Sequence, residues 1–270
     1  MFAFLFYLIA DTLVRLLPAR VADSVGVGIA RVAFMLRLPH RKALEENLSR
    51  LMQLPPGRTV RERARESFVN FALTFTDFLR MGRLDRARLA ESVEVHGREH
   101  LDAARNSGRG VILLSAHLGN WELGAAWLAA LGTPVNVIAR PHASAVERFF
   151  ARRRRAWGVA NLPGRPLWRG AAEALRRREW VALMADREAS SQAKSGSVCA
   201  WAAALSRRTG ALVLPAVIVR LPNRRYAAYF DRPLPPETVR EESYLRVIRR
   251  YLQRFPGQWF AFEPLPRGLT

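Results

Sequence analysis

The chain has 270 residues, of which 50% are hydrophobic and 24% charged, and its formal net charge is +20. This composition excludes a disordered or fibrous protein and is typical of a folded domain with a sizeable core. The charge predicts an anionic partner, and it leaves nucleic acid, anionic lipid headgroups and an acidic carrier protein open. The single cysteine excludes an intramolecular disulfide and a cysteine-based zinc site. The five histidines lack metal-ligand spacing, so we expect no metal.

The N-terminal segment from Met1 to Leu17 is strongly apolar, but its first charged residue is Asp11. A helix needs about 20 apolar residues to span a bilayer, so this run is short. It also lacks the basic region that begins a signal peptide. We expect a helix that lies in or dips into the membrane interface, and the alternative is a helix packed on the protein's own core. We therefore divide the chain into a membrane-associating segment, residues 1–38, and one domain, residues 39–270.

Residues 39–89 are helical in pattern, because apolar side chains recur at three- and four-residue spacings. The Leu-Pro-Pro-Gly sequence at residues 54–57 separates two helices.

From residue 93 onward, short apolar runs alternate with helical segments. The runs predict strands over residues 93–97, 111–115, 135–139, near 159, 181–185 and 212–220, with an antiparallel edge strand at 225–230. The helices are expected over residues 99–106, 121–131, 145–157, 171–178, 200–208 and 243–255. This alternation predicts an α/β fold, a single domain with a mainly parallel or mixed sheet that helices flank on both faces.

Polar residues follow three of the predicted strands. His117 comes after residues 111–115, Arg140 after 135–139 and Asp186 after 181–185. Sites in parallel sheets lie beyond the carboxyl ends of the strands, so we expect these three side chains to converge there. Asp186 is also a candidate to cap the next segment or to pair with an arginine.

His117 and Glu122 are the residues best suited to chemistry. A neutral imidazole can take the proton of an attacking hydroxyl near pH 7, and a carboxylate can orient it. On a continuous helix, residues five apart would diverge by about 140°. The turn formers Gly119 and Asn120 stand between them, so the chain can fold back and bring the two side chains together. The helix that begins near Trp121 would also point free N–H groups at an anionic group.

The decapeptide from Ser115 to Gly124, Ser-Ala-His-Leu-Gly-Asn-Trp-Glu-Leu-Gly, resembles the HX4(D/E) signature of the bacterial lipid A biosynthesis (late) acyltransferases. That family lies within the wider lysophospholipid acyltransferase superfamily. Further segments are similar in the same order, so the resemblance covers about residues 40 to 262. They are Glu46–Leu48, Ala139–Pro141, Arg154–Gly158, Met184–Asp186, Arg250–Leu252 and Pro256–Trp259.

The resemblance implies a glycerol-3-phosphate acyltransferase-like fold and assigns roles to particular residues. His117 would be the base and Glu122 its partner. Arg140 would bind phosphate or help to stabilise the oxyanion, assisted by Arg154 or Arg155. The substrate-binding residues expected on this basis are Arg140, Arg154, Arg155, Asp186 and Asn120.

The resemblance also implies the reaction and its setting. The donor would be a thioester of acyl carrier protein or coenzyme A, the acceptor a hydroxyl of a membrane glycolipid such as a lipid A precursor, and no cofactor would be needed. The protein would sit on the cytoplasmic face of the inner membrane. After Asp186 the family has a glutamine and then a glycine-rich stretch with paired aromatic residues. Here residues 187–198 are shorter and lack aromatics, which leaves the acceptor and the acyl chain length open.

Two other functions are consistent with parts of the sequence. An esterase or thioesterase could use the same two residues with water as the acceptor, although the sequence has no Gly-x-Ser-x-Gly elbow. The positive charge alone would suit a nucleic-acid-binding protein, but aromatic residues are not interleaved with the basic ones as a base-stacking surface requires.

Overall fold

The computed structural model describes residues 2–83, 85–138, 145–162, 167–186, 198–238 and 241–265. The strands are β1 (Val93–His96), β2 (Val111–Ser115), β3 (Val135–Val137), β4 (Ala160–Asn161), β5 (Trp180–Met184), β6 (Leu212–Arg220) and β7 (Tyr226–Phe230). The α-helices are α1 (Phe2–Leu16), α2 (Ala19–Met35), α3 (Pro39–Met52), α4 (Arg58–Arg80), α5 (Arg86–Glu91), α6 (Arg98–Asn106), α7 (Trp121–Ala130), α8 (Ala145–Ala156), α9 (Leu167–Arg176), α10 (Val198–Thr209) and α11 (Glu241–Arg254). Three short 3₁₀ turns, η1 (Met81–Arg83), η2 (Pro222–Arg224) and η3 (Pro256–Gln258), complete the described elements.

In the part of the chain that the structure describes, the strands form one sheet in the order β1-β7-β6-β2-β5-β3-β4. The pairs from β6 to β4 are parallel, whereas β7 is antiparallel to β6. The predicted α/β class with a mainly parallel sheet is therefore confirmed. The strand at 225–230 is antiparallel to β6 as predicted, but it is not at the edge, because β1 pairs with its other side in parallel.

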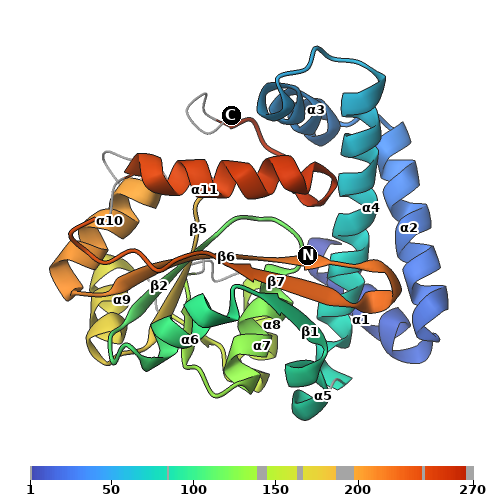
Figure 1. The fold of residues 1–270 in the computed structure, drawn as a ribbon. Coiled ribbons are helices and arrows are strands. Elements are labelled where there is room, and N and C mark those ends of the chain that lie inside the picture. Colours follow the sequence, from blue (N-terminus) through green and yellow to red (C-terminus); the bar gives the residue numbers. More distant parts are fainter. Residues whose placement is uncertain are drawn as a thin grey trace.

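Helices cover both faces of the sheet (Figure 1). The sequence of β2 shows why both of its faces can be buried. All five residues of β2 are buried, as expected for a strand between two helical layers. Ile112 and Leu114 join a core with α9, α10 and α11, whereas Val111 and Leu113 join a second core with α6 and α7. The strand period of two thus divides its side chains between the two cores.

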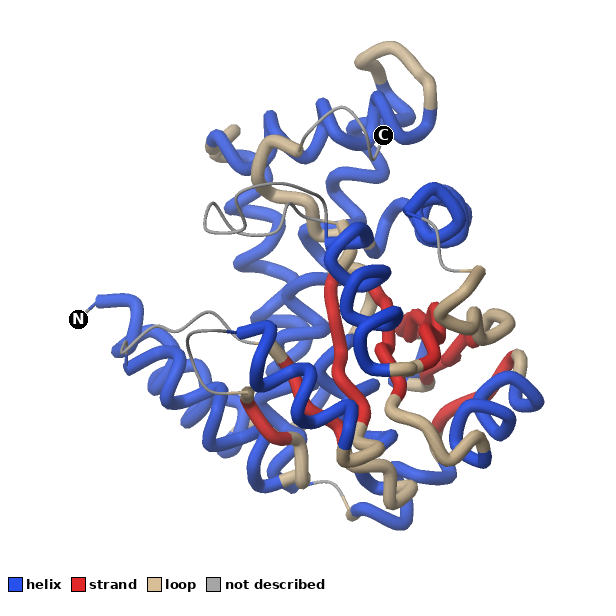
Figure 2. Tube along the Cα trace, turned by 90° about the vertical axis from the view of Figure 1, so that its left-hand side faces the viewer, coloured by secondary structure: helices blue, strands red, loops and turns tan. Residues whose placement is uncertain are grey.

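The N-terminal helices stand at one end of the sheet. Helix α2 packs along α4 (Figure 1), and α1, which begins beside the N-terminus marked in Figure 2, contacts both α4 and α8. The Tyr7 ring of α1 lies 5.5 Å from Phe75 of α4 and 5.5 Å from Phe150 of α8. No described helix is both long enough and apolar enough to cross a membrane. These contacts confirm one part of the alternative reading of the N-terminus, since one side of α1 packs on the protein.

A partly buried ion network joins α2 to the sheet. Asp23 of α2 accepts hydrogen bonds from Arg80 of α4 at 2.8 Å and from Arg224 at 2.8 Å. Asp77 of α4 accepts hydrogen bonds from Arg220 at the end of β6 at 2.7 Å and from the Tyr226 hydroxyl of β7 at 2.5 Å. These pairs join α2 and α4 to β6. Strand β6 lies beside β2, and His117 follows β2 in the chain.

Candidate active site

His117 and Asp186 occupy matching positions beyond two neighbouring strands. Strands β2 and β5 pair in parallel with Ser115 opposite Met184, and the Ala185 N–H extends the ladder by donating to the Ser115 carbonyl at 2.7 Å. Both residues lie two positions beyond the Ser115–Met184 pair, so the register brings them opposite each other. The distance from His117 Nδ1 to Asp186 Oδ1 is 2.9 Å.

The Asp186 carboxylate is enclosed by the protein, and both of its oxygens accept hydrogen bonds. Its side chain is 1% exposed, and its second oxygen accepts a hydrogen bond from Trp259 Nε1 at 2.9 Å. Burial acts to raise the pKa of the Asp186 carboxyl, but the charge and hydrogen bond of His117, together with the Trp259 N–H, outweigh it and hold that pKa below its ordinary value. Asp186 is therefore an ionised acceptor for both neighbours.

The pairing also determines which nitrogen of His117 can act as a base. A carboxylate only accepts hydrogen bonds, so Nδ1 carries a hydrogen, and in the neutral imidazole the lone pair is on Nε2. The His117 side chain is 22% exposed, whereas its partner is enclosed. The edge of the imidazole contacts the Trp121 ring at a centroid distance of 5.1 Å. An oriented imidazole with a buried carboxylate behind it can remove a proton from a hydroxyl or from water.

The turn between His117 and α7 is pressed against β6. Gly119 has φ +63°, and a Cβ atom at this position would lie 2.0 Å from the Ile218 carbonyl oxygen. Its N–H donates to the Gln258 carbonyl at 2.9 Å, and the Asn120 N–H donates to the Ile218 carbonyl at 3.0 Å. Only glycine combines this conformation with so close a backbone contact.

Asn120, predicted as a substrate-binding residue, is the N-cap of α7. Its side-chain oxygen accepts a hydrogen bond from the Leu123 N–H at 3.1 Å, and the residue is fully buried. An asparagine at this position satisfies one of the free N–H groups in the first turn of the helix. The structure thus places the Asn120 side chain inside the protein, where it starts α7.

Glu122 is paired with Arg154 of α8. The guanidinium donates to both carboxylate oxygens, at 2.8 Å from Nε and 2.6 Å from Nη2. Glu122 is 9% exposed and Arg154 14%, so this bidentate pair is largely shielded from water. Glu122 lies in the first turn of α7, where a negative charge is favourable. The described hydrogen bonds therefore join His117 to Asp186 and Glu122 to Arg154, instead of the expected His117–Glu122 pair.

The three predicted arginines have different surroundings. Besides Glu122, Arg154 contacts Glu147 at 3.4 Å and Asn161 at 3.3 Å, so its guanidinium is held by protein groups. Arg155 is exposed on α8. Arg140 lies outside the described residues, as does the segment 187–197.

Metal ligands do not gather in the part of the chain that the structure describes, where no group of three or more His, Cys, Asp or Glu side chains is placed to hold an ion. The sequence did not single out Trp259, although Pro256–Trp259 was one of the segments that resemble the late acyltransferases. Because the indole and Asp186 are 73 residues apart, only the fold reveals that they meet.

Comparison with known proteins identifies a family and several relatives that this chain resembles. The family described as bacterial lipid A biosynthesis acyltransferase matches residues 1–258. A phosphatidylinositol mannoside acyltransferase from Mycolicibacterium smegmatis is 31% identical over 181 residues, which cover 65% of this chain and 59% of that protein. One from Mycobacterium tuberculosis is 29% identical over 152 residues, covering 54% of this chain and 48% of that protein. The alignments thus span only about half of these relatives' lengths.

Among solved structures, the 1-acyl-sn-glycerophosphate (LPA) acyltransferase PlsC from Thermotoga maritima aligns with a TM-score of 0.41 at 15% identity. The alignment covers 71% of this chain and 83% of that one.

Proposed function

The chain belongs to the bacterial lipid A biosynthesis acyltransferase family, and from that premise we propose that it is an O-acyltransferase in which His117 and Asp186 form the catalytic pair. The observation that carries the proposal is the 2.9 Å contact between the imidazole of His117, which lies in the segment that resembles the family's signature, and the buried carboxylate of Asp186. Glu122 acts indirectly, since it holds Arg154 and fixes the first turn of α7.

The proposed reaction begins with proton transfer from the acceptor hydroxyl to Nε2 of His117. As the proton leaves, the hydroxyl oxygen attacks the carbonyl carbon of the acyl thioester and forms a tetrahedral oxyanion. The carbon–sulfur bond then breaks, and the departing thiolate takes the proton back from the imidazolium. Asp186 stabilises the imidazolium while it carries that proton.

We propose acyl carrier protein or coenzyme A as the carrier of the thioester and a membrane glycolipid as the acceptor. The formal charge of +20 suits an acidic carrier and an anionic lipid headgroup alike. The curated relatives bear the name phosphatidylinositol mannoside acyltransferase, and a mannosylated lipid of that class is an acceptor to test beside a lipid A precursor.

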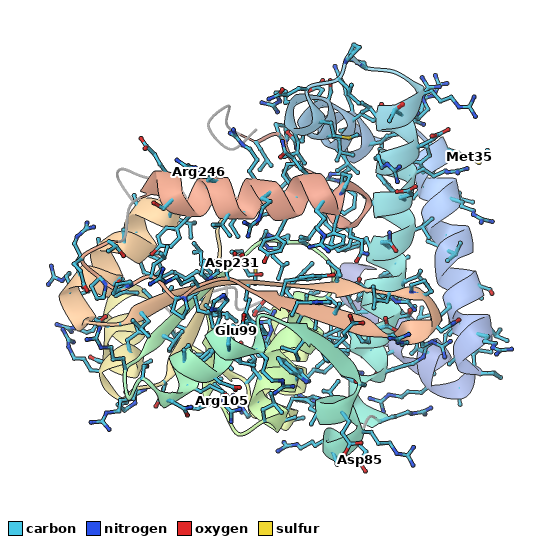
Figure 3. All side chains as sticks on the ribbon, viewed as in Figure 1. Met35, Asp85, Glu99, Arg105, Asp231 and Arg246 are labelled. Carbon is cyan, nitrogen blue, oxygen red and sulfur yellow. The ribbon has the colours of Figure 1, made fainter. Side chains whose placement is uncertain are left out.

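We also propose that α1 and α2 dock on the membrane, at the cytoplasmic face of the inner membrane. Their outward sides carry a row of exposed large apolar residues, of which Met35 points away from the molecule at the end of α2 (Figure 3). The exposed residues are Leu5, Phe6, Leu8, Ile9, Leu13 and Leu16 on α1, and Val21, Val25, Ile29, Val32 and Met35 on α2.

The spacing of the apolar residues on α2 places them on one side of the helix. Residues 21, 25, 29 and 32 follow one another at four- and three-residue intervals, which is one stripe of a helix. The exposed Arg20 and Arg31 flank the stripe, as anionic headgroups beside an apolar contact would require. The occupant that fits both features is an anionic bilayer surface.

One experiment tests the proposed activity. The purified protein and a His117→Ala variant are given a palmitoyl thioester of acyl carrier protein, with and without a lipid acceptor, and acyl-lipid and free fatty acid are both measured. We expect acyl-lipid from the wild-type protein only, in the presence of acceptor. Free fatty acid regardless of acceptor would instead indicate a thioesterase. Equal transfer by the His117→Ala variant would overturn the proposed role of His117.

A further inference from the structure

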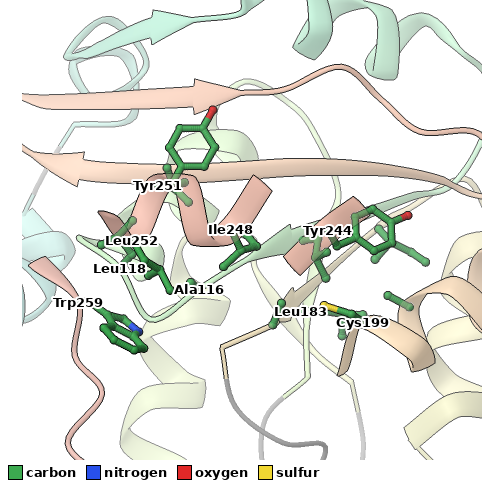
Figure 4. Packing of buried hydrophobic residues seen from close by; sticks show 14 of the residues in the cluster. Ala116, Leu118, Leu183, Cys199, Tyr244, Ile248, Tyr251, Leu252 and Trp259 are labelled. Carbon is green, nitrogen blue, oxygen red and sulfur yellow. The ribbon is translucent and has the colours of Figure 1, made fainter. Parts of the chain in front are cut away.

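Trp259 is the second hydrogen-bond partner of Asp186, on the side of the carboxylate away from His117. Its indole N–H reaches Oδ2 at 2.9 Å, while His117 Nδ1 lies at the same distance from Oδ1. Trp259 is fully buried, and it packs near Ala116 and Leu118 in the core beside the site (Figure 4). The carboxylate is thus held between two donors that approach its two oxygens.

The backbone around Trp259 runs along the loop that carries His117. Leu118 and Trp259 form an antiparallel bridge, and the Phe260 N–H donates to the His117 carbonyl at 3.0 Å. The Gly119 N–H donates to the Gln258 carbonyl at 2.9 Å. The segment 258–260 therefore contacts the imidazole-bearing loop through its backbone and Asp186 through its indole.

This segment is itself anchored on two rigid elements. The Gln258 side chain makes two hydrogen bonds of 2.8 Å with the backbone N–H and carbonyl of Arg220 in β6. Asn70 of α4 donates to the Gly257 carbonyl at 2.8 Å. A side chain held by such an anchor keeps its position while substrates enter and leave.

We propose that Trp259 is a positioning residue of the catalytic centre: its indole N–H fixes the Asp186 carboxylate in the orientation that presents Oδ1 to His117. Without this donor, Oδ2 would lose its indole partner inside the protein, and the carboxylate would be held by the side chain and backbone of His117 alone. The inference rests on the proposed function, because it assumes that His117 is the base.

The indole donor has a second effect on the chemistry. A hydrogen bond to Oδ2 draws negative charge toward that oxygen and away from the oxygen that faces the imidazole. When the donor is removed, more charge faces His117, which favours the protonated imidazole. A protonated imidazole cannot accept the proton of the hydroxyl, so kcat falls at low pH. This fall, the acid limb of the plot of kcat against pH, should move to higher pH when the donor is removed.

The test compares Trp259→Phe with a matched variant, Trp127→Phe. Trp127 is also a buried tryptophan, 1% exposed, whose indole N–H makes one hydrogen bond, to the Ala90 carbonyl at 3.1 Å. Each variant replaces an indole with a smaller phenyl ring and removes one indole hydrogen bond, but only the indole of Trp259 faces Asp186. Acceptor-dependent acyl transfer is measured as kcat and KM between pH 5 and 9.

For Trp259→Phe we expect kcat to fall by between about ten- and a hundredfold, with KM within about threefold of the wild-type value and the acid limb moved upward in pH. For Trp127→Phe we expect an unchanged limb. A Trp259→Phe protein with wild-type kcat and an unmoved limb would overturn the inference. Loss of activity in the His117→Ala variant must accompany either result, and transfer by that variant would contradict the proposed function instead.

A second replacement covers the case in which phenylalanine prevents folding at position 259. Benzothienylalanine keeps the shape of tryptophan and has sulfur in place of the N–H group. The same fall in kcat and the same upward movement of the limb are expected. A benzothienylalanine protein that matches the wild type in both would show that Trp259 acts by packing alone.

Discussion

The imidazole Nδ1 of His117 lies 2.9 Å from Oδ1 of Asp186, although the two residues are 69 positions apart in the chain. Their contact follows from the parallel register of β2 and β5, which places Ser115 opposite Met184. Glu122, the acidic residue that is nearer to His117 in the sequence, pairs with Arg154 instead. The site therefore depends on sheet pairing more than on the spacing inside the motif.

Replacing Gly119 by alanine should abolish transfer and destabilise the fold. The added Cβ would meet the Ile218 carbonyl at 2.0 Å, so the turn that carries His117 must move away from β6. We expect a loss of about 2–4 kcal/mol in the free energy of unfolding. Gly108→Ala is the matched control, because Gly108 also has positive φ, +66°, but open space around its Cβ position. That variant should lose about 1 kcal/mol and keep its activity. Equal effects in urea unfolding would contradict the steric explanation.

Replacing Arg154 by methionine should destabilise the protein by about 3 kcal/mol, because it leaves the buried Glu122 carboxylate without its partner. Arg155→Met, one residue away on an exposed side of α8, should stay within about 0.5 kcal/mol of the wild type. Urea unfolding at pH 7 measures both. If the two variants proved equally stable, the Glu122–Arg154 pair would have no structural importance.

The attachment of α2 should depend on pH through Asp23. Burial acts to raise the pKa of the Asp23 carboxyl, but its hydrogen bonds from Arg224 and Arg80 outweigh this and lower that pKa. A lowered pKa in the folded state contributes stability that is present above the unfolded value, about 3.9, and is lost as the pH falls through the folded value. Asp23→Asn should therefore be less stable than the wild type at pH 7, and the difference should shrink below about pH 4. A constant difference from pH 7 to pH 3 would exclude this role.

The apolar stripe of α2 should determine membrane binding. A triple change of Val25, Ile29 and Val32 to serine should reduce flotation with phosphatidylglycerol-containing vesicles at least about tenfold, since each side chain contributes on the order of 1 kcal/mol when buried. Trp168→Ser removes an exposed apolar side chain on α9 and is the control. Equal flotation of the triple variant and the control would exclude α2 as the docking surface.

Much of the fold could be predicted because the local patterns are strong. The buried runs at β2, β5 and β6 have no alternation, which predicted strands between two helical layers, and β6 begins and ends as expected. Helix α2 was not predicted as an element of its own. Its apolar stripe from Val21 to Val32 is present in the sequence, but it faces outward. The more strongly apolar residues 1–17 dominated the prediction for the N-terminal segment.

The site could be predicted only in part. The strand ends predicted that His117 and Asp186 converge, and the two side chains do meet. The order of strands in a sheet is a property of tertiary packing, so the sequence could not predict their direct hydrogen bond. The turn at Gly119 and Asn120 suggested a return toward Glu122. In the structure that turn instead follows β6 and the segment 258–260, and Glu122 faces α8.

The pairing of His117 with Asp186 is tested most directly by the proton NMR signal of the His117 Nδ1–H group, compared among the wild type, Asp186→Asn and Glu122→Gln. Only five histidines are present, so His117→Ala identifies the signal by its absence. We expect a strongly downfield resonance in the wild type, because the Nδ1 proton is hydrogen-bonded to a buried carboxylate. The resonance should persist in Glu122→Gln and be lost or moved far upfield in Asp186→Asn. Loss of the resonance in Glu122→Gln with its retention in Asp186→Asn would show that His117 pairs with Glu122 and not with Asp186.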